Sequence, residues 1–122
     1  MVSETVDASC HCGAVAMAMP RPLEVTSCNC SICRRYGVLC AYYRPDQVRF
    51  GPAMPQTDIY MWDDRSIRFH RCQTCGCVTH WSAVDSGAGR MGINARLLPL
   101  DILAQARVRR LDGAGTERYV DD

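Results

Sequence analysis

Lysine is absent from this 122-residue chain, and all 14 of its lysine-or-arginine side chains are arginine. Without lysine, covalent catalysis through a lysine Schiff base is excluded. The formal net charge is only +1 at pH 7, so the chain lacks the excess of positive charge that is typical of nucleic-acid-binding proteins. We therefore expect no nucleic-acid partner.

Long apolar segments are missing as well. No run approaches the roughly 20 apolar residues that a membrane-spanning helix needs, and no lipidation signal is visible. Residues 1–7 contain neither the basic nor the apolar part of a signal peptide. We therefore expect no membrane partner and a location in the reducing cytoplasm.

Cysteine, by contrast, is abundant, with nine residues. Seven of them form three short clusters: Cys10 and Cys12; Cys28, Cys30 and Cys33; Cys72 and Cys75. Zinc held by four thiolates is coordinatively closed and stabilises a fold, whereas zinc held by three protein ligands keeps a position for water or substrate. Seven ligands therefore predict one structural zinc and one reactive, more labile zinc.

Neighbouring residues indicate how the clusters pair. A glycine directly follows the first and third clusters, at Gly13 and Gly76, and permits the sharp turn that points backbone N–H groups at sulfur. These two clusters are predicted to share the structural site. The middle cluster is followed by Arg34 and Arg35, whose positive charges are expected to lower the pKa of the adjacent thiol.

Two other arrangements of the cysteines stay open. A zinc ribbon would pair the last two cysteines of the middle cluster with the third cluster, which leaves three clustered cysteines without a role. A disulfide framework is the other alternative, but the odd number and the close spacing of the cysteines disfavour it. Cys40 and Cys77 are expected to be small core residues, although Cys77 would close the open site if it became a fourth ligand.

Short strand-like segments separated by turn residues dominate the chain. Strands are predicted at residues 13–19, 23–27, 38–43, 57–62, 66–71, 78–82, 91–95 and 106–111. Short helical turns are predicted at residues 31–36 and 45–47, and residues 97–103 are ambiguous because Pro99 interrupts them. The expected fold class is mainly β, with short helical turns.

One domain over residues 1–122 is the expected organisation. The cysteine clusters reach from residue 10 to residue 75, so a boundary between them would split a metal site. The length of the chain suits a single domain of ordinary size.

Three motifs together resemble a known family. They are SCHCGAV at residues 9–15, CNCSICRRYG at residues 28–37 and FHRCQTCG at residues 69–76. Their order, followed by GINARLL at residues 92–98, is similar to that of the glutathione-dependent formaldehyde-activating (Gfa-like) enzymes. The resemblance implies a tent-like, all-β zinc-binding fold. It also implies a structural zinc on Cys10, Cys12, Cys72 and Cys75 and a catalytic zinc on Cys28, Cys30 and Cys33.

The activity that the resemblance implies is that of a carbon–sulfur lyase, which joins glutathione or another small thiol to formaldehyde or a similar aldehyde. A thiol bound to the open zinc would lose its proton and attack the aldehyde carbon. Arg34 or Arg35 is expected to pair with a carboxylate of glutathione. The alternatives are a non-catalytic zinc- and glutathione-binding module and a structural zinc scaffold for protein interaction. His80 is expected to be a buried structural residue rather than a proton carrier.

Overall fold

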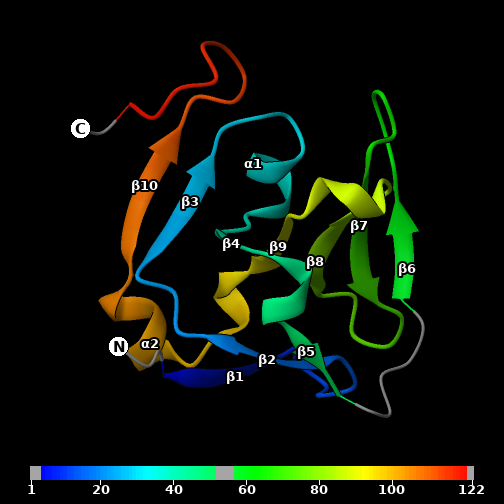
Figure 1. The fold of residues 1–122 in the computed structure, drawn as a ribbon, viewed down its shortest axis with the longest axis vertical. Coiled ribbons are helices and arrows are strands. Elements are labelled where there is room, and N and C mark those ends of the chain that lie inside the picture. Colours follow the sequence, from blue (N-terminus) through cyan, green and yellow to red (C-terminus); the bar gives the residue numbers. More distant parts are fainter. Residues whose placement is uncertain (1–3, 52–56, 121–122) are drawn as a thin grey trace.

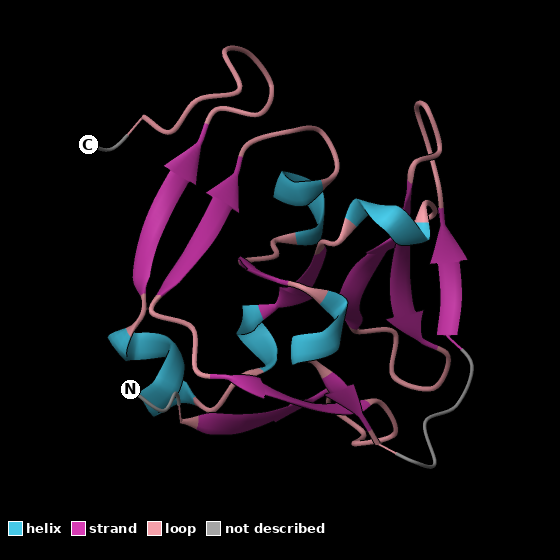
Figure 2. Cartoon of the chain, in the orientation of Figure 1, coloured by secondary structure: helices cyan, strands magenta, loops and turns pink. Residues whose placement is uncertain are grey.

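The strands of the chain form two sheets in the computed structural model, which describes residues 4–51 and 57–120 (Figures 1 and 2). The smaller sheet has the order β1-β2-β5 and consists of β1 Thr5–Ser9, β2 Ala16–Pro20 and β5 Arg49–Phe50. The larger sheet has the order β10-β3-β4-β9-β8-β7-β6. Its strands are β3 Glu24–Cys28, β4 Cys40–Tyr43, β6 Thr57–Tyr60, β7 Ile67–Cys72, β8 Val78–Ala83, β9 Met91–Asn94 and β10 Arg107–Leu111. The prediction of a mainly β fold is confirmed.

Helical segments are short. They are α1 Cys33–Tyr36, α2 Leu100–Gln105 and three 3-10 turns, η1 Pro45–Gln47, η2 Ser86–Ala88 and η3 Ala95–Leu97. α1 confirms the predicted turn at residues 31–36, and it ends at Gly37, whose φ of 70° is left-handed. At six residues, α2 is the longest helix in the described ranges and falls far short of what crossing a bilayer requires.

A single apolar core joins the two sheets. β1 and β2 alternate buried and more exposed residues, so that Val6 and Met19 face inward from the smaller sheet. They belong to the same buried cluster as Val25 and Ile93 from the larger sheet. Figure 1 shows the smaller sheet below the larger one, with α1 between the β3–β10 pair and the β6–β8 hairpins. The helix bearing Cys33 is thus held between two parts of one curved sheet.

Three segments differ from the sequence-based expectations, and a fourth, which the sequence left ambiguous, is a helix. The strand expected at residues 13–19 begins only at Ala16, because Gly13 has a φ of 84° and belongs to a turn. β1 and β5 were not predicted: β1 carries polar residues on its exposed face, and β5 is only two residues long. In the ambiguous segment at residues 97–103, α2 begins directly after Pro99.

β10 has the largest effect on the candidate site. It runs parallel to β3, with Leu111 in register with Cys28. The strand therefore brings the C-terminal part of the chain to the end of β3, where the middle cysteine cluster begins.

Gly92 in β9 is predicted to be essential for packing. A Cβ atom at this position would overlap the indole nitrogen of Trp81 and lie 2.5 Å from Cys40 Sγ. Gly92→Ala should lower the free energy of unfolding by about 2–3 kcal/mol, as expected for overpacking of a filled site, measured by urea denaturation. The matched control is Gly51→Ala, whose Cβ would meet nothing closer than 3.8 Å and should change stability by less than about 0.5 kcal/mol. Equal stabilities of the two variants would contradict this packing.

Candidate metal centres and the adjoining pockets

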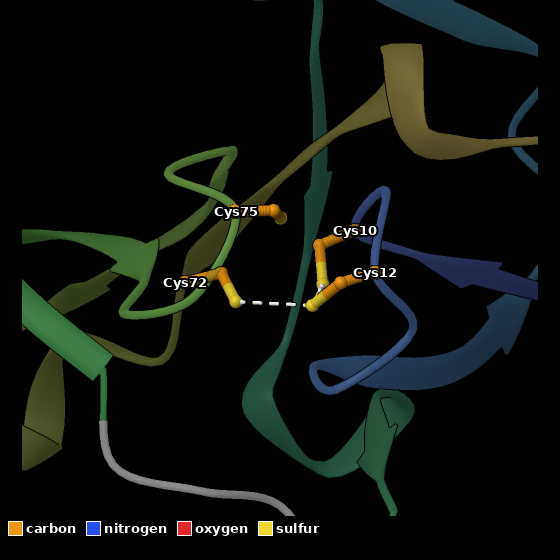
Figure 3. A group of neighbouring side chains, drawn as sticks. All are labelled: Cys10, Cys12, Cys72 and Cys75. Carbon is orange, nitrogen blue, oxygen red and sulfur yellow. Dashed lines mark hydrogen bonds between the residues drawn. The ribbon is translucent and has the colours of Figure 1, made fainter.

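Four cysteine sulfurs from two turns converge between the sheets (Figure 3). Cys10 and Cys12 follow β1, while Cys72 ends β7 and Cys75 lies in the turn before β8. The Sγ atom of Cys12 is 3.7 Å from that of Cys10 and 3.6 Å from that of Cys72, and all four sulfurs lie within 4.8 Å of one another. Zinc–sulfur bonds of about 2.3 Å in a tetrahedron require sulfur separations of about 3.8 Å. The arrangement fits a four-thiolate zinc site.

The turns that carry these cysteines orient backbone N–H groups toward sulfur. Gly13 and Gly76 adopt left-handed φ angles of 84° and 79°, as expected for the glycines after each cysteine pair. The backbone N–H groups of Cys77 and Cys12 lower the pKa of Cys75 to about 5. Since zinc binds the thiolate form, the turns prepare this cysteine for a metal.

A second group of three sulfurs lies at the end of β3. Cys28 is the last residue of β3, Cys30 lies in the following loop and Cys33 begins α1. Their sulfurs are within 4.8 Å of one another, and within the described residues no fourth cysteine, histidine or carboxylate joins them. Zinc held here would keep an open coordination position.

These two groups settle the pairing that the sequence left open. The cysteines following β1 associate with those around the end of β7, and the middle cluster stands alone, so the zinc-ribbon pairing is wrong. The structure shows no disulfide in its described residues, where all nine cysteines are free.

The thiols of the middle cluster differ in acidity. Burial, followed by the neighbouring thiol of Cys30, raises the pKa of Cys33. The expectation that the adjacent arginines lower this pKa is wrong, because burial dominates and Arg34 and Arg35 are exposed on α1. Burial also opposes ionisation of Cys30, but the backbone N–H of Cys33 and the thiols of Cys33 and Cys28 lower its pKa overall. Cys30 is therefore the cysteine of this cluster that ionises most readily.

The loop after β10 covers one side of the middle cluster. The backbone N–H of Gly113 faces the sulfur of Cys28 and opposes the rise in its pKa that burial causes. A Cβ atom at this position would lie only 2.5 Å from that sulfur, so the approach requires glycine. The Asn29 side chain holds the loop with two hydrogen bonds of 2.9 Å, one to Asp112 and one from the backbone N–H of Ala114.

A cavity of about 490 Å³, which we call the aromatic pocket, opens onto all three cysteines of the middle cluster. Its aromatic lining consists of Tyr42, Trp62, Phe69 and Trp81, and its charged lining of Asp63, Asp64, Arg90 and Glu117. The guanidinium of Arg90 packs over the ring of Tyr42, 4.0 Å from its centroid. The volume and the apolar walls are typical of a small-molecule site.

A second cavity of about 450 Å³, the arginine pocket, adjoins the same cluster at Cys28 and Cys33. Its charged lining consists of Arg34, Arg96, Arg110 and Asp112. Arg35 does not line either pocket: it borders a separate cavity beside Tyr36 and donates a hydrogen bond of 2.8 Å to the carbonyl of Ser31. A larger cavity of about 730 Å³ runs along the smaller sheet, but no cysteine lines it, so it offers no ligand to either candidate metal.

The other cysteines and His80 were expected to be structural. Cys40 is buried in β4 and accepts a hydrogen bond of 3.3 Å from Trp81 Nε1. Cys77 packs against the core and belongs to neither group of metal-binding sulfurs. His80 is buried, and burial, followed by the charge of His70, lowers its pKa to about 3. The imidazole rings of His70 and His80 stack with their centroids 4.1 Å apart. All three residues fit the structural interpretation.

Sequence reasoning missed several residues around the middle cluster, among them Arg90, Arg96, Arg110 and Gly113. The dipeptide Asp112-Gly113 indicates a turn, but only the parallel pairing of β10 with β3 brings that turn to Cys28. Arg90 and Arg110 belong to no motif, and Arg96 lies in the GINARLL segment at residues 92–98, which assigned it no role. No local signal distinguishes the three from other exposed arginines.

Comparison with known proteins gives a consistent result. The sequence profile described as "Glutathione-dependent formaldehyde-activating enzyme" matches residues 5–106. Among solved structures, the chain is similar to a crystal structure of a Rhodobacter sphaeroides protein, a structural-genomics target, with 26% identity and a TM-score of 0.68. That similarity covers 84% of this chain and 98% of the other. No curated protein matches the chain. On the match to residues 5–106, the chain belongs to the family of glutathione-dependent formaldehyde-activating enzymes.

Proposed function

We propose that the middle cysteine cluster holds a reactive zinc at which glutathione, or another small thiol, adds to formaldehyde or a similar aldehyde. The observation that carries the proposal is the convergence of the three sulfurs of Cys28, Cys30 and Cys33 at the wall of the aromatic pocket. The description of the family to which the chain belongs names glutathione and formaldehyde. The reaction class is therefore carbon–sulfur bond formation, the reverse of a carbon–sulfur lyase cleavage.

In this reaction, the thiol sulfur forms a bond to the aldehyde carbon, and the electron pair of the C=O bond takes up a proton to give a hydroxymethyl thioether. Zinc on three thiolates would supply a coordination position in which the substrate thiol loses its proton near neutral pH. The chain's own part is to hold Cys28, Cys30 and Cys33 in this geometry and to exclude bulk water with the aromatic walls.

The proposed roles of the two arginines after Cys33 differ in their support. Arg34 lines the arginine pocket next to Cys28 and Cys33, which supports contact with a substrate carboxylate. Arg35 borders a different cavity and engages the carbonyl of Ser31. We therefore propose that Arg34 binds the substrate. The same role for Arg35 has less support, because its side chain borders a different cavity.

We assign a structural zinc to the four-thiolate site. Cys10 and Cys12 lie beside the smaller sheet, and Cys72 belongs to the larger sheet. A metal bound by these residues and Cys75 would tie the two sheets together without an open position.

Cys30→Ser should separate the two sites. We expect zinc to fall from about two ions per chain to about one, measured on protein purified without oxygen. Loss of a residue that only contacts a metal ligand lowers activity about 10–100-fold. Because Cys30 is itself a proposed ligand, thiol-dependent consumption of formaldehyde should fall by more than this.

Cys77→Ser is the matched control, because Cys77 lies outside both metal-binding groups. It should keep both zinc ions and the activity. Two zinc ions without any acceleration of aldehyde consumption in the unaltered protein would favour the binding module. One zinc ion per chain in both the unaltered protein and Cys30→Ser would favour the structural scaffold.

Gly113→Ala should weaken metal binding at the middle cluster alone. The new methyl group would press on Cys28 Sγ and displace the N–H donor, so we expect about 10–100-fold lower affinity for the second metal. The charge-transfer absorbance of cobalt bound by thiolates, titrated against a chelator, measures this affinity. Gly51→Ala should leave both affinities unchanged, and an unaltered second affinity in Gly113→Ala would remove this role of the loop.

Cys12→Ser should destabilise the whole fold. It removes one ligand of the site that links the sheets, so the melting temperature should fall by about 10 °C or more, measured by circular dichroism. Cys30→Ser, which leaves the four-thiolate site intact, should lower the melting temperature much less. Equal losses in the two variants would contradict the separate structural role of the first site.

A further inference from the structure

The cavity that Arg35 borders is separate from the two pockets at the middle cluster. Its volume is about 390 Å³, which lies in the usual range for small-molecule sites. Its lining includes three aromatic rings and two guanidinium groups, those of Tyr36, Tyr60, Trp62, Arg35 and Arg71. Among the described residues, no cysteine and no carboxylate lines this cavity. We call it the tyrosine pocket.

α1 and the hairpin of β6 and β7 form the walls of the tyrosine pocket. Tyr60 is in register with Phe69, and Asp58 is in register with Arg71. Because alternate residues of a strand point to the same face, these two pairs share one face of the hairpin. α1 packs on that face, since the ring centroid of Tyr36 is 5.7 Å from that of Phe69. The pocket therefore collects side chains from two elements that are distant in sequence.

The rings at the mouth of the pocket are accessible. Tyr60 is 48% exposed and Trp62 is 41% exposed, although large aromatic side chains generally contribute to protein cores and interfaces. A tight turn fixes the backbone at Trp62, because the backbone N–H of Arg65 donates a hydrogen bond of 3.0 Å to its carbonyl. Asp63 and Arg65 in this turn adopt left-handed φ angles of 55° and 57°, which residues other than glycine rarely do. The fold thus presents aromatic surface to a ligand.

The charge of the pocket favours an anion. Arg35 is oriented by a hydrogen bond of 2.8 Å from its Nη1 to the carbonyl of Ser31. Arg71 Nη2 lies 3.7 Å from Asp58 Oδ2, and each of these side chains is 46% exposed, so the ion pair is weak. Burial raises the pKa of Tyr36, and the positive charge of Arg71 opposes this rise. The guanidinium of Arg71 therefore acts on the interior of the pocket as well as on Asp58.

We propose that the tyrosine pocket binds a small molecule in which a planar aromatic ring carries an anionic group, either a carboxylate or a phosphate. The ring stacks against the side chains of Tyr36, Tyr60 and Trp62. The anionic group pairs with Arg35 and Arg71 through charge-assisted hydrogen bonds. Glutathione and formaldehyde contain no aromatic ring, so this ligand is different from both substrates of the proposed function.

The two tryptophans of the chain provide a specific readout. Trp62 lines both the tyrosine pocket and the aromatic pocket, whereas Trp81 lines only the aromatic pocket of these two. In ¹H–¹⁵N NMR spectra of the zinc-loaded protein, a ligand in the tyrosine pocket should shift the indole signal of Trp62 and leave that of Trp81 in place. The probes are 2-naphthoate and adenosine monophosphate, which distinguish a carboxylate from a phosphate. Cyclohexanecarboxylate, which has no aromatic ring, and adenosine, which has no charge, should bind at least about fivefold more weakly.

Two variants test the two halves of the recognition. Arg71→Gln should weaken the better probe about fivefold, the upper range for an exposed ion pair. Tyr60→Leu should weaken it about fivefold as well, as expected for the loss of one aromatic pair. Arg68→Gln is the matched control, because Arg68 lies on the same strand but does not line the pocket, and it should bind the probe normally. Unchanged unfolding midpoints show that the variants are folded.

Several results would overturn the proposal. They are the absence of a Trp62 shift with both probes, an equal shift of Trp81, and an equal loss of affinity in Arg68→Gln. Displacement of the bound probe by glutathione would also overturn it, because the pocket would then belong to the thiol site. The zinc content and the aldehyde consumption that test the proposed function are measured without these probes, so either proposal can fail while the other stands.

Discussion

The convergence of four cysteine sulfurs joins the two sheets of this protein and is the constraint on which the rest of the structure depends. Cys12 and Cys72 are 60 residues apart in sequence, yet their sulfurs are 3.6 Å apart. One set of ligands follows β1 of the smaller sheet, and the other surrounds the end of β7 of the larger sheet. In a chain of this length the apolar core is modest, so a metal bound here would supply stability that packing alone provides less readily.

The middle cluster lies in the same fold but brings together three sulfurs instead of four. Its three sulfurs come from one short stretch, Cys28 to Cys33, which runs from the end of β3 into α1. Partners from distant parts of the chain complete its surroundings: Gly113 after β10 lies close to Cys28, and two pockets adjoin the thiols. A metal held by these three sulfurs would keep one open coordination position, and both cavities adjoin its ligands.

Local signals in the sequence predicted the fold class and the grouping of the clustered cysteines. The glycines after Cys12 and Cys75 indicated the turns correctly, because a positive φ is a local requirement that glycine meets. The surroundings of the thiols could not be predicted in the same way. Burial reverses the pKa shift that the sequence of Cys33 and Arg34 suggests, and the contact of Gly113 depends on long-range parallel pairing of β10 with β3. Burial and strand pairing are properties of the whole fold.

Two groups of cysteine sulfurs, one of four and one of three, are the central feature of this protein. Cadmium-113 NMR on protein loaded without oxygen tests most directly whether they bind metal with different coordination, because the cadmium chemical shift depends on the number of sulfur ligands. Two resonances of equal intensity are expected. The one from Cys10, Cys12, Cys72 and Cys75 should not respond to glutathione, whereas the one from Cys28, Cys30 and Cys33 should shift as the fourth ligand is replaced by the glutathione thiolate. A single resonance, or two resonances that both ignore glutathione, would contradict an open second site.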